Sequence, residues 1–85
     1  MKKIYNVVVS YRGFDPARDK NILSSLERRD RRLFGGSGFS FVDGSRDLSF
    51  DTYHKEIAKR LQTNLRNVLK QNKIRARVEI FSGDI

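Results

Sequence analysis

Residues 35–50, GGSGFSFVDGSRDLSF, carry the pattern that decides the predicted fold. Large apolar residues lie on both sides of Gly44-Ser45, and glycine at the first central position favours a two-residue type II′ turn between paired strands. Such a turn fixes the register of a β-hairpin and sets four large apolar side chains on one face, in the pairs Phe41–Leu48 and Phe39–Phe50. We therefore expect this face of the hairpin to belong to the hydrophobic core.

The flanking sequence predicts two further strands and two helices. Asp15-Pro16 is a typical helix start, with aspartate as N-cap and proline at the first helical position. The strands are expected at 4–11 and 74–81, and the helices from Pro16 to about Arg32 and, after a cap at Asp51 or Thr52, to about Gln71. The order β-α-β-β-α-β predicts an α+β, ferredoxin-like fold: a four-stranded antiparallel sheet, in the order 4-1-3-2, with two helices on one face. We expect residues 1–85 to form one domain.

The chain is strongly basic, with 18 Lys and Arg against 10 Asp and Glu and a net charge of +8. This excess favours a polyanionic partner or an acidic protein surface. The chain has no cysteine, so it offers neither a disulfide nor a thiolate ligand for a metal. No apolar run approaches the ~20 residues of a membrane span, and no signal-peptide core is visible, so we expect a cytoplasmic protein without a membrane partner.

Basic residues mark the candidate binding surface. The second predicted helix carries a stripe opposite its apolar face, formed by Lys55, Lys59, Arg66 and Lys70. A second group, Arg28, Arg31 and Arg32, lies at the end of the first predicted helix, where positive charge suits the helix dipole. A third group, Arg75 and Arg77, lies on the last predicted strand. We expect a non-enzymatic binding module for nucleic acid, RNA being slightly favoured, which contacts phosphates without a cofactor or metal.

Two short motifs resemble signatures of RNA-binding families. Gly38-Phe39-Ser40-Phe41-Val42 is similar to the middle of the RNA-recognition-motif signature, whose aromatic residues stack on bases from an open sheet. Ser37 and Gly44 depart from that signature, and the expected register assigns both phenylalanines to the core. Gly35-Gly36-Ser37-Gly38 fits the Gly-x-x-Gly pattern of KH domains, but it joins a helix to a strand, so we interpret it as a helix C-cap.

Two other functions fit the same sequence. A small phage-type or antitoxin-like inhibitor or adaptor would dock its basic surface on an acidic protein. A ferredoxin-like metal-dependent nuclease would need a shared acidic or histidine site, for which Asp51 and His54 are the candidates, although Ser10 and Tyr11 stand where such nucleases often place an acid. The second and last strands are the expected sheet edges, through which two copies could form a homodimer.

Overall fold

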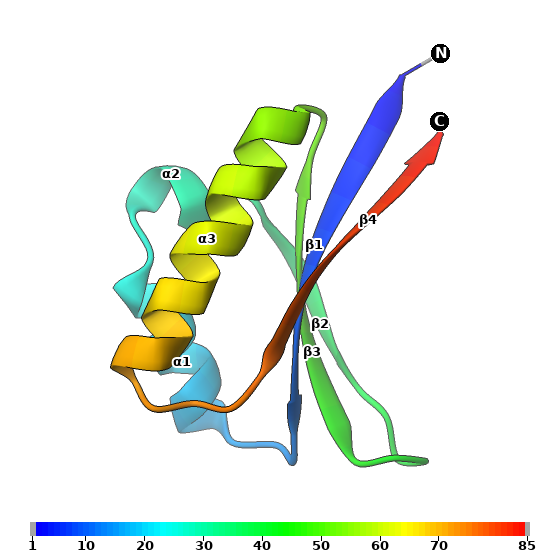
Figure 1. Cartoon of the computed structure of the whole chain (residues 1–85). Coiled ribbons are helices and arrows are strands. Elements are labelled where there is room, and N and C mark those ends of the chain that lie inside the picture. The colour runs from blue at the N-terminus through cyan, green and yellow to red at the C-terminus, as the bar shows by residue number, and fades with distance from the viewer. Residues whose placement is uncertain (1, 85) are drawn as a thin grey trace.

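The computed structural model of the protein describes residues 2–84, and its backbone follows the order β-α-α-β-β-α-β (Figure 1). The strands are β1 (Lys3–Arg12), β2 (Phe34–Phe39), β3 (Ser45–Thr52) and β4 (Arg77–Asp84), and the helices are α1 (Pro16–Ser25), α2 (Arg28–Arg31) and α3 (Lys55–Gln71). The strands form one antiparallel sheet in the order β2-β3-β1-β4, so β2 and β4 are its edges. This strand order is the expected one.

The three helices lie on one side of the sheet and leave its other face open (Figure 1). The core between the layers has three parts. Alternate strand residues supply Val7, Val9, Tyr11, Leu48, Phe50 and Val78, and the first connection supplies Ile22 and Leu26. The apolar stripe of α3 supplies Ala58, Leu61, Leu65, Val68 and Leu69. Successive side chains of a strand point to opposite faces, so the other residues of β1 and β3 lie on the open face. There Asn6 Nδ2 donates to Asp51 at 2.6 Å, and Ser10 Oγ donates to Asp47 at 2.8 Å.

The predicted ferredoxin-like fold with two helices is wrong, because the first connection forms two helices and residues 2–84 contain three. The backbone leaves the helical conformation at Leu26 and Glu27 before α2 begins. An unbroken helix would place Asp30 one turn after Leu26, on the apolar stripe. The break instead lets the Asp30 carboxylate, which is fully buried, accept hydrogen bonds from Arg60 at 3.0 Å and Asn64 at 2.8 Å on α3.

The hairpin of β2 and β3 forms in a different register from the predicted one. Phe34, and not Phe39, lies opposite Phe50, and these two rings pack edge to face with centroids 5.5 Å apart. The chain reverses through a longer loop, residues 40–44, whose ends are joined by backbone hydrogen bonds. Phe39 is therefore half-buried at the end of β2, and Phe41 is 92% exposed, so the prediction that both belong to the core is wrong.

Local hydrogen bonds and one close approach explain this register. The Asp43 carboxylate accepts hydrogen bonds from the backbone N–H and the hydroxyl of Ser45, at 3.0 and 2.7 Å, which stabilises the longer loop. Gly44 has a positive φ of 70°, which glycine adopts at little cost. Gly35 lies so close to the Asp51 carboxylate that a Cβ atom there would overlap it. The glycine-rich segment is thus part of β2, and not the expected helix C-cap.

Candidate functional site

Helix α3 has two polar flanks that face different parts of the molecule. Arg60 and Asn64 lie on one flank and bind Asp30 of α2. Gln62 lies on the other flank, where its Nε2 donates a hydrogen bond of 3.0 Å to the backbone oxygen of Val78 in β4. At 3.6 residues per turn, the flank of Gln62 also carries the predicted stripe, Lys55, Lys59, Arg66 and Lys70. The stripe therefore runs beside the β4 edge of the sheet.

The stripe is part of a larger basic surface along this edge. Further cations come from both ends of β1, from the start of β4 and from the turn before it. We call this surface the basic flank, and it consists of Lys2, Lys3, Arg12, Lys55, Lys59, Arg66, Lys70, Lys73, Arg75 and Arg77. Six of its ten cations were candidates from the sequence. The four that sequence reasoning missed, Lys2, Lys3, Arg12 and Lys73, join the surface because β1 pairs with β4 and because the turn after α3 leads into β4.

No cation of the basic flank forms an ion pair within residues 2–84. The ion pairs of this part of the chain are Arg18–Asp15, Arg29–Glu27, Arg46–Asp19 and Arg60–Asp30. Each of these pairs contains a residue of α1 or α2, so the neutralised arginines lie away from the β4 edge. The acids in the region of the basic flank are Asp43, Glu56, Glu79 and Asp84. Positive charge is therefore concentrated, and left unpaired, along one side of the protein.

A groove of about 310 Å³, the lysine groove, lies at the end of the basic flank where α3 begins. Its lining combines apolar and cationic side chains: Tyr5, Ala58 and Ile80 with Lys3, Lys55, Lys59 and Ser82. A neighbouring depression shares Lys3 and adds Lys2, the exposed Tyr53 and the exposed His54. Apolar and aromatic surface surrounded by unpaired cations suits a ligand that has both negative charge and flat apolar parts.

A second groove of about 310 Å³, the arginine groove, lies at the other end of the basic flank, where β1 ends and β4 begins. It is lined by Arg12, Arg75 and Arg77 together with Ser10, Tyr11, Asp43, Ser45 and Ala76. Hydrogen bonds from Ser45 lower the pKa of the Asp43 carboxyl, which keeps this group ionised; the hydroxyl contributes most and the backbone N–H next. Three guanidinium groups against one carboxylate leave a net positive charge, which suits a phosphate.

Lys73 lies between Lys70 of α3 and Arg75 of the arginine groove, and its backbone has a left-handed conformation. Its φ is 55°, at the position after a helix where glycine is usual. The backbone N–H groups of Lys73 and Ile74 close the helix end by donating to the oxygens of Lys70 and Leu69, at 3.2 and 2.9 Å. This conformation costs a non-glycine residue about 1–2 kcal/mol. The chain thus keeps a cation between Lys70 and Arg75 at the expense of stability.

The predicted arginines of the first connection form a separate surface. Arg28 and Arg31 lie in α2, Arg32 is its C-cap, and all three are exposed. Because α2 packs on the Arg60 flank of α3, the helix α3 lies between these arginines and the basic flank (Figure 1). The structure therefore brings the α3, Arg75 and Arg77 candidates together and leaves the α2 candidates apart.

The open sheet face lacks the aromatic pair that an RNA-recognition motif places there. Phe39 and Phe41 lie at the end of β2 and in the following loop, and Phe81, which is 52% exposed, lies opposite Asn6 on the open face. Asn6 lies between Phe81 and the acid Asp51, to which it donates a hydrogen bond, and the acid Glu79 lies on the same face two residues before Phe81. This part of the open face is therefore a poor platform for a polyanion.

The residues considered for a nuclease do not assemble a metal site. Asp51 accepts a hydrogen bond from Asn6, and His54 is exposed at the N-cap of α3. Within residues 2–84, no three His, Cys, Asp or Glu side chains come together as metal ligands. Over the same range, no helix combines the length and apolar character that a membrane crossing requires.

Comparisons with known proteins bear on the fold. No protein-family model matches the chain, and no curated protein matches it. Among solved structures, the chain is similar to the de novo designed protein Foldit4, with a TM-score of 0.56 and 18% sequence identity over 100% of this chain and 99% of that one. At this identity the likeness concerns the fold alone.

Proposed function

We propose that the protein is a non-enzymatic module that binds nucleic acid, with RNA slightly favoured, through the basic flank. The observation that carries this proposal is the segregation of charge: ten cations line the β4 edge without an ion pair within residues 2–84, while the ion-paired arginines contact α1 or α2. Like charges gathered on one surface repel each other and destabilise the folded state. A bound polyanion relieves this repulsion.

The spacing of the cations fits a phosphate backbone better than one small anion. Along α3, the steps from Lys55 to Lys59, then to Arg66 and to Lys70, rise by about 6, 10 and 6 Å at 1.5 Å per residue. The row continues into the lysine groove at one end and the arginine groove at the other. Contacts of this kind read phosphates and not base identity, so they predict weak sequence preference and strong salt dependence.

A fluorescence-anisotropy titration tests the proposal. Labelled single-stranded RNA, single-stranded DNA and duplex DNA are each titrated with the native protein at low and at moderate salt. With about six phosphate contacts, the affinity should fall by roughly a thousandfold between about 50 and 200 mM salt. Absence of binding to all three nucleic acids at low salt would refute the proposal.

An acidic protein surface is the alternative partner for the same cations, as an inhibitor or adaptor would use them. A pulldown from lysate with and without nuclease treatment distinguishes the two. Loss of the captured material after nuclease supports the nucleic-acid proposal. A stoichiometric protein partner that survives nuclease supports the inhibitor or adaptor.

A further inference from the structure

The loop between β2 and β3 presents an aromatic ring that other rings hold in place. Phe41 is 92% exposed, yet it packs at 83° against Phe39 with centroids 5.1 Å apart. Phe39 in turn packs at 66° against Phe14, with centroids 6.0 Å apart. Phe41 therefore has a defined position and keeps most of its ring surface free. We call these three rings the aromatic platform.

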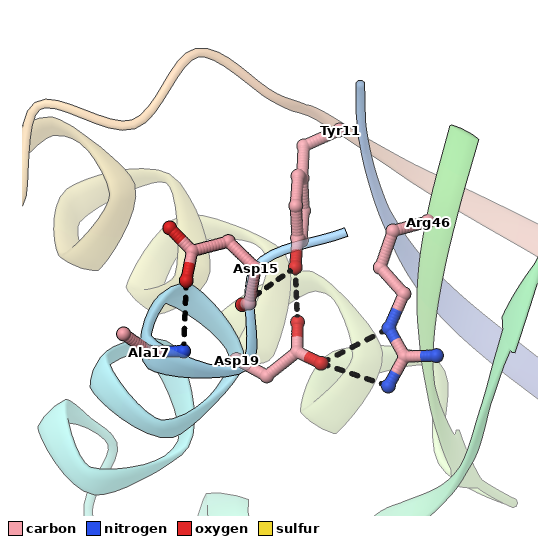
Figure 2. Close-up of polar contacts among 5 residues, drawn as sticks. All are labelled: Tyr11, Asp15, Ala17, Asp19 and Arg46. Atoms are coloured by element: carbon pink, nitrogen blue, oxygen red, sulfur yellow. Dashed lines mark hydrogen bonds and ion pairs between the residues drawn. The ribbon is translucent and has the colours of Figure 1, made fainter. Parts of the chain in front are cut away.

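A buried ion pair anchors the aromatic platform to α1. The Arg46 guanidinium lies 4.3 Å from the centroid of the Phe14 ring. Arg46 donates two hydrogen bonds, of 3.0 and 2.8 Å, to one oxygen of the Asp19 carboxylate, while the other oxygen accepts the Tyr11 hydroxyl (Figure 2). Both side chains of the ion pair are 13% exposed, so water competes little for these contacts. The ion pair thus holds Phe14, the ring of the platform that lies nearest to α1.

The loop that carries Phe41 also lines the arginine groove. Asp43, two residues after Phe41, is part of that lining, and two residues span at most about 7 Å. Phe14 follows Arg12 by two residues, and the Gly13 N–H donates to the Gly44 oxygen at 2.7 Å, so the aromatic platform borders the arginine groove at Arg12 and Asp43. Aromatic rings stack on bases of any sequence, and neighbouring cations hold the phosphates of the same strand.

This arrangement distinguishes between forms of nucleic acid. In a duplex the bases are paired and stacked on each other, so their faces are not available to a protein ring. Resting on the proposed function, we infer that the aromatic platform stacks an unpaired nucleobase while the arginine groove holds adjacent phosphates. The bound nucleic acid is accordingly single-stranded where it crosses this end of the sheet.

A tryptophan reporter tests the stacking directly, because the chain has no tryptophan of its own. Phe41→Trp places one indole at the platform, where its fluorescence reports a stacked base. Titration with single-stranded oligoadenylate should quench this fluorescence, whereas the duplex of oligoadenylate with oligouridylate and the polyanion heparin should bind without quenching. Quenching of equal depth by the duplex or by heparin would overturn the inference.

A matched pair of truncations measures the effect on affinity. Phe41→Ala should weaken binding of single-stranded oligoadenylate by about five- to a hundredfold, the range for loss of one stacked base. Phe81→Ala removes a ring that is 52% exposed on the acidic open face, and it should leave the affinity unchanged. Circular dichroism of both variants checks that the fold is kept.

The outcomes separate this inference from the proposed function. If oligoadenylate binds the native protein but neither quenches the indole nor distinguishes Phe41→Ala from Phe81→Ala, the platform inference is wrong and the basic flank still binds. If no nucleic acid binds, both proposals fail. If the indole signal of Phe41→Trp changes with protein concentration alone, the platform is a contact between copies of the chain, and the inference is overturned.

Discussion

Replacement of Lys73 by glycine should make the protein more stable and a weaker binder. Lys73 has a φ of 55° at the end of α3, where glycine is the usual residue. A side chain in this conformation costs about 1–2 kcal/mol. Glycine removes that cost, but it also makes the unfolded chain more flexible, which lowers the unfolding free energy by about 0.5–1 kcal/mol. The unfolding free energy of Lys73→Gly should therefore rise by about 0.5–1 kcal/mol.

The same substitution removes one cation from the middle of the basic flank. If Lys73 contacts one phosphate of a single strand, the slope of log K against log salt should become shallower by about 0.7. Lys73→Ala is the matched control, because it removes the same charge but keeps a Cβ atom in the left-handed conformation. Both variants should lose the same affinity, and only Lys73→Gly should gain stability.

Urea denaturation followed by circular dichroism measures the stability, and fluorescence anisotropy with single-stranded RNA at several salt concentrations measures the binding. With a urea slope near 1 kcal/mol per M, the midpoint of Lys73→Gly should rise by about 0.5–1 M. A lower midpoint for Lys73→Gly than for the native protein would refute the strain argument. Unchanged salt slopes in both variants would remove Lys73 from the binding surface.

Three further comparisons test packing elsewhere in the fold. Asp30→Ala should lower the unfolding free energy in urea by about 3 kcal/mol, the low end for a broken buried pair, because the Arg60 side chain is 35% exposed. Glu27→Ala breaks an exposed ion pair and should cost less than about 1 kcal/mol. Equal costs would contradict the role of Asp30. Phe34→Ala should cost about 2 kcal/mol, because Phe34 packs against Phe50, and Phe41→Ala should cost under about 0.5 kcal/mol; the reverse order would restore the originally predicted register. Burial, and then the hydrogen bond to Asp19, raise the pKa of Tyr11 above 10.0. The stability that Tyr11 contributes is therefore complete below pH 10 and is lost as the pH rises through the folded pKa, so Tyr11→Phe should lose less stability than the native protein between pH 8 and about 11; parallel losses would contradict this.

The sequence was informative where periodicity alone determines the structure. The alternation in β1 and β3, the apolar stripe of α3 and the order of the elements predicted the order of the strands and the exposure of Lys55 and Lys59. The hairpin register was not predictable in this way, because two local turns compete at Gly44-Ser45. Contacts between distant residues decide between them: Phe34 packs on Phe50, and Gly35 fits against Asp51. The exposed position of Phe41 follows from that choice.

The break in the first connection has the same kind of origin. Asp30 looks like one more charge in a basic run, and only its contacts with Arg60 and Asn64, which are 30 and 34 positions away, make it a buried anchor. Charge composition predicted a basic surface but not its extent. Arg12 and Lys73 enter the basic flank through strand pairing and a left-handed turn, which no local pattern marks.

The measurement that tests the basic flank most directly compares two sets of three substitutions with equal loss of charge. One variant carries Lys59→Gln, Arg66→Gln and Lys70→Gln in the basic flank, and the other carries Arg28→Gln, Arg31→Gln and Arg32→Gln in and beside α2. All six side chains are exposed, so both variants should fold. With single-stranded RNA, the salt slope of the flank variant should become shallower by about 2, at 0.7 per lost phosphate contact, while the α2 variant keeps the native slope. Equal slopes for the two variants, or a larger change in the α2 variant, would contradict binding through the basic flank.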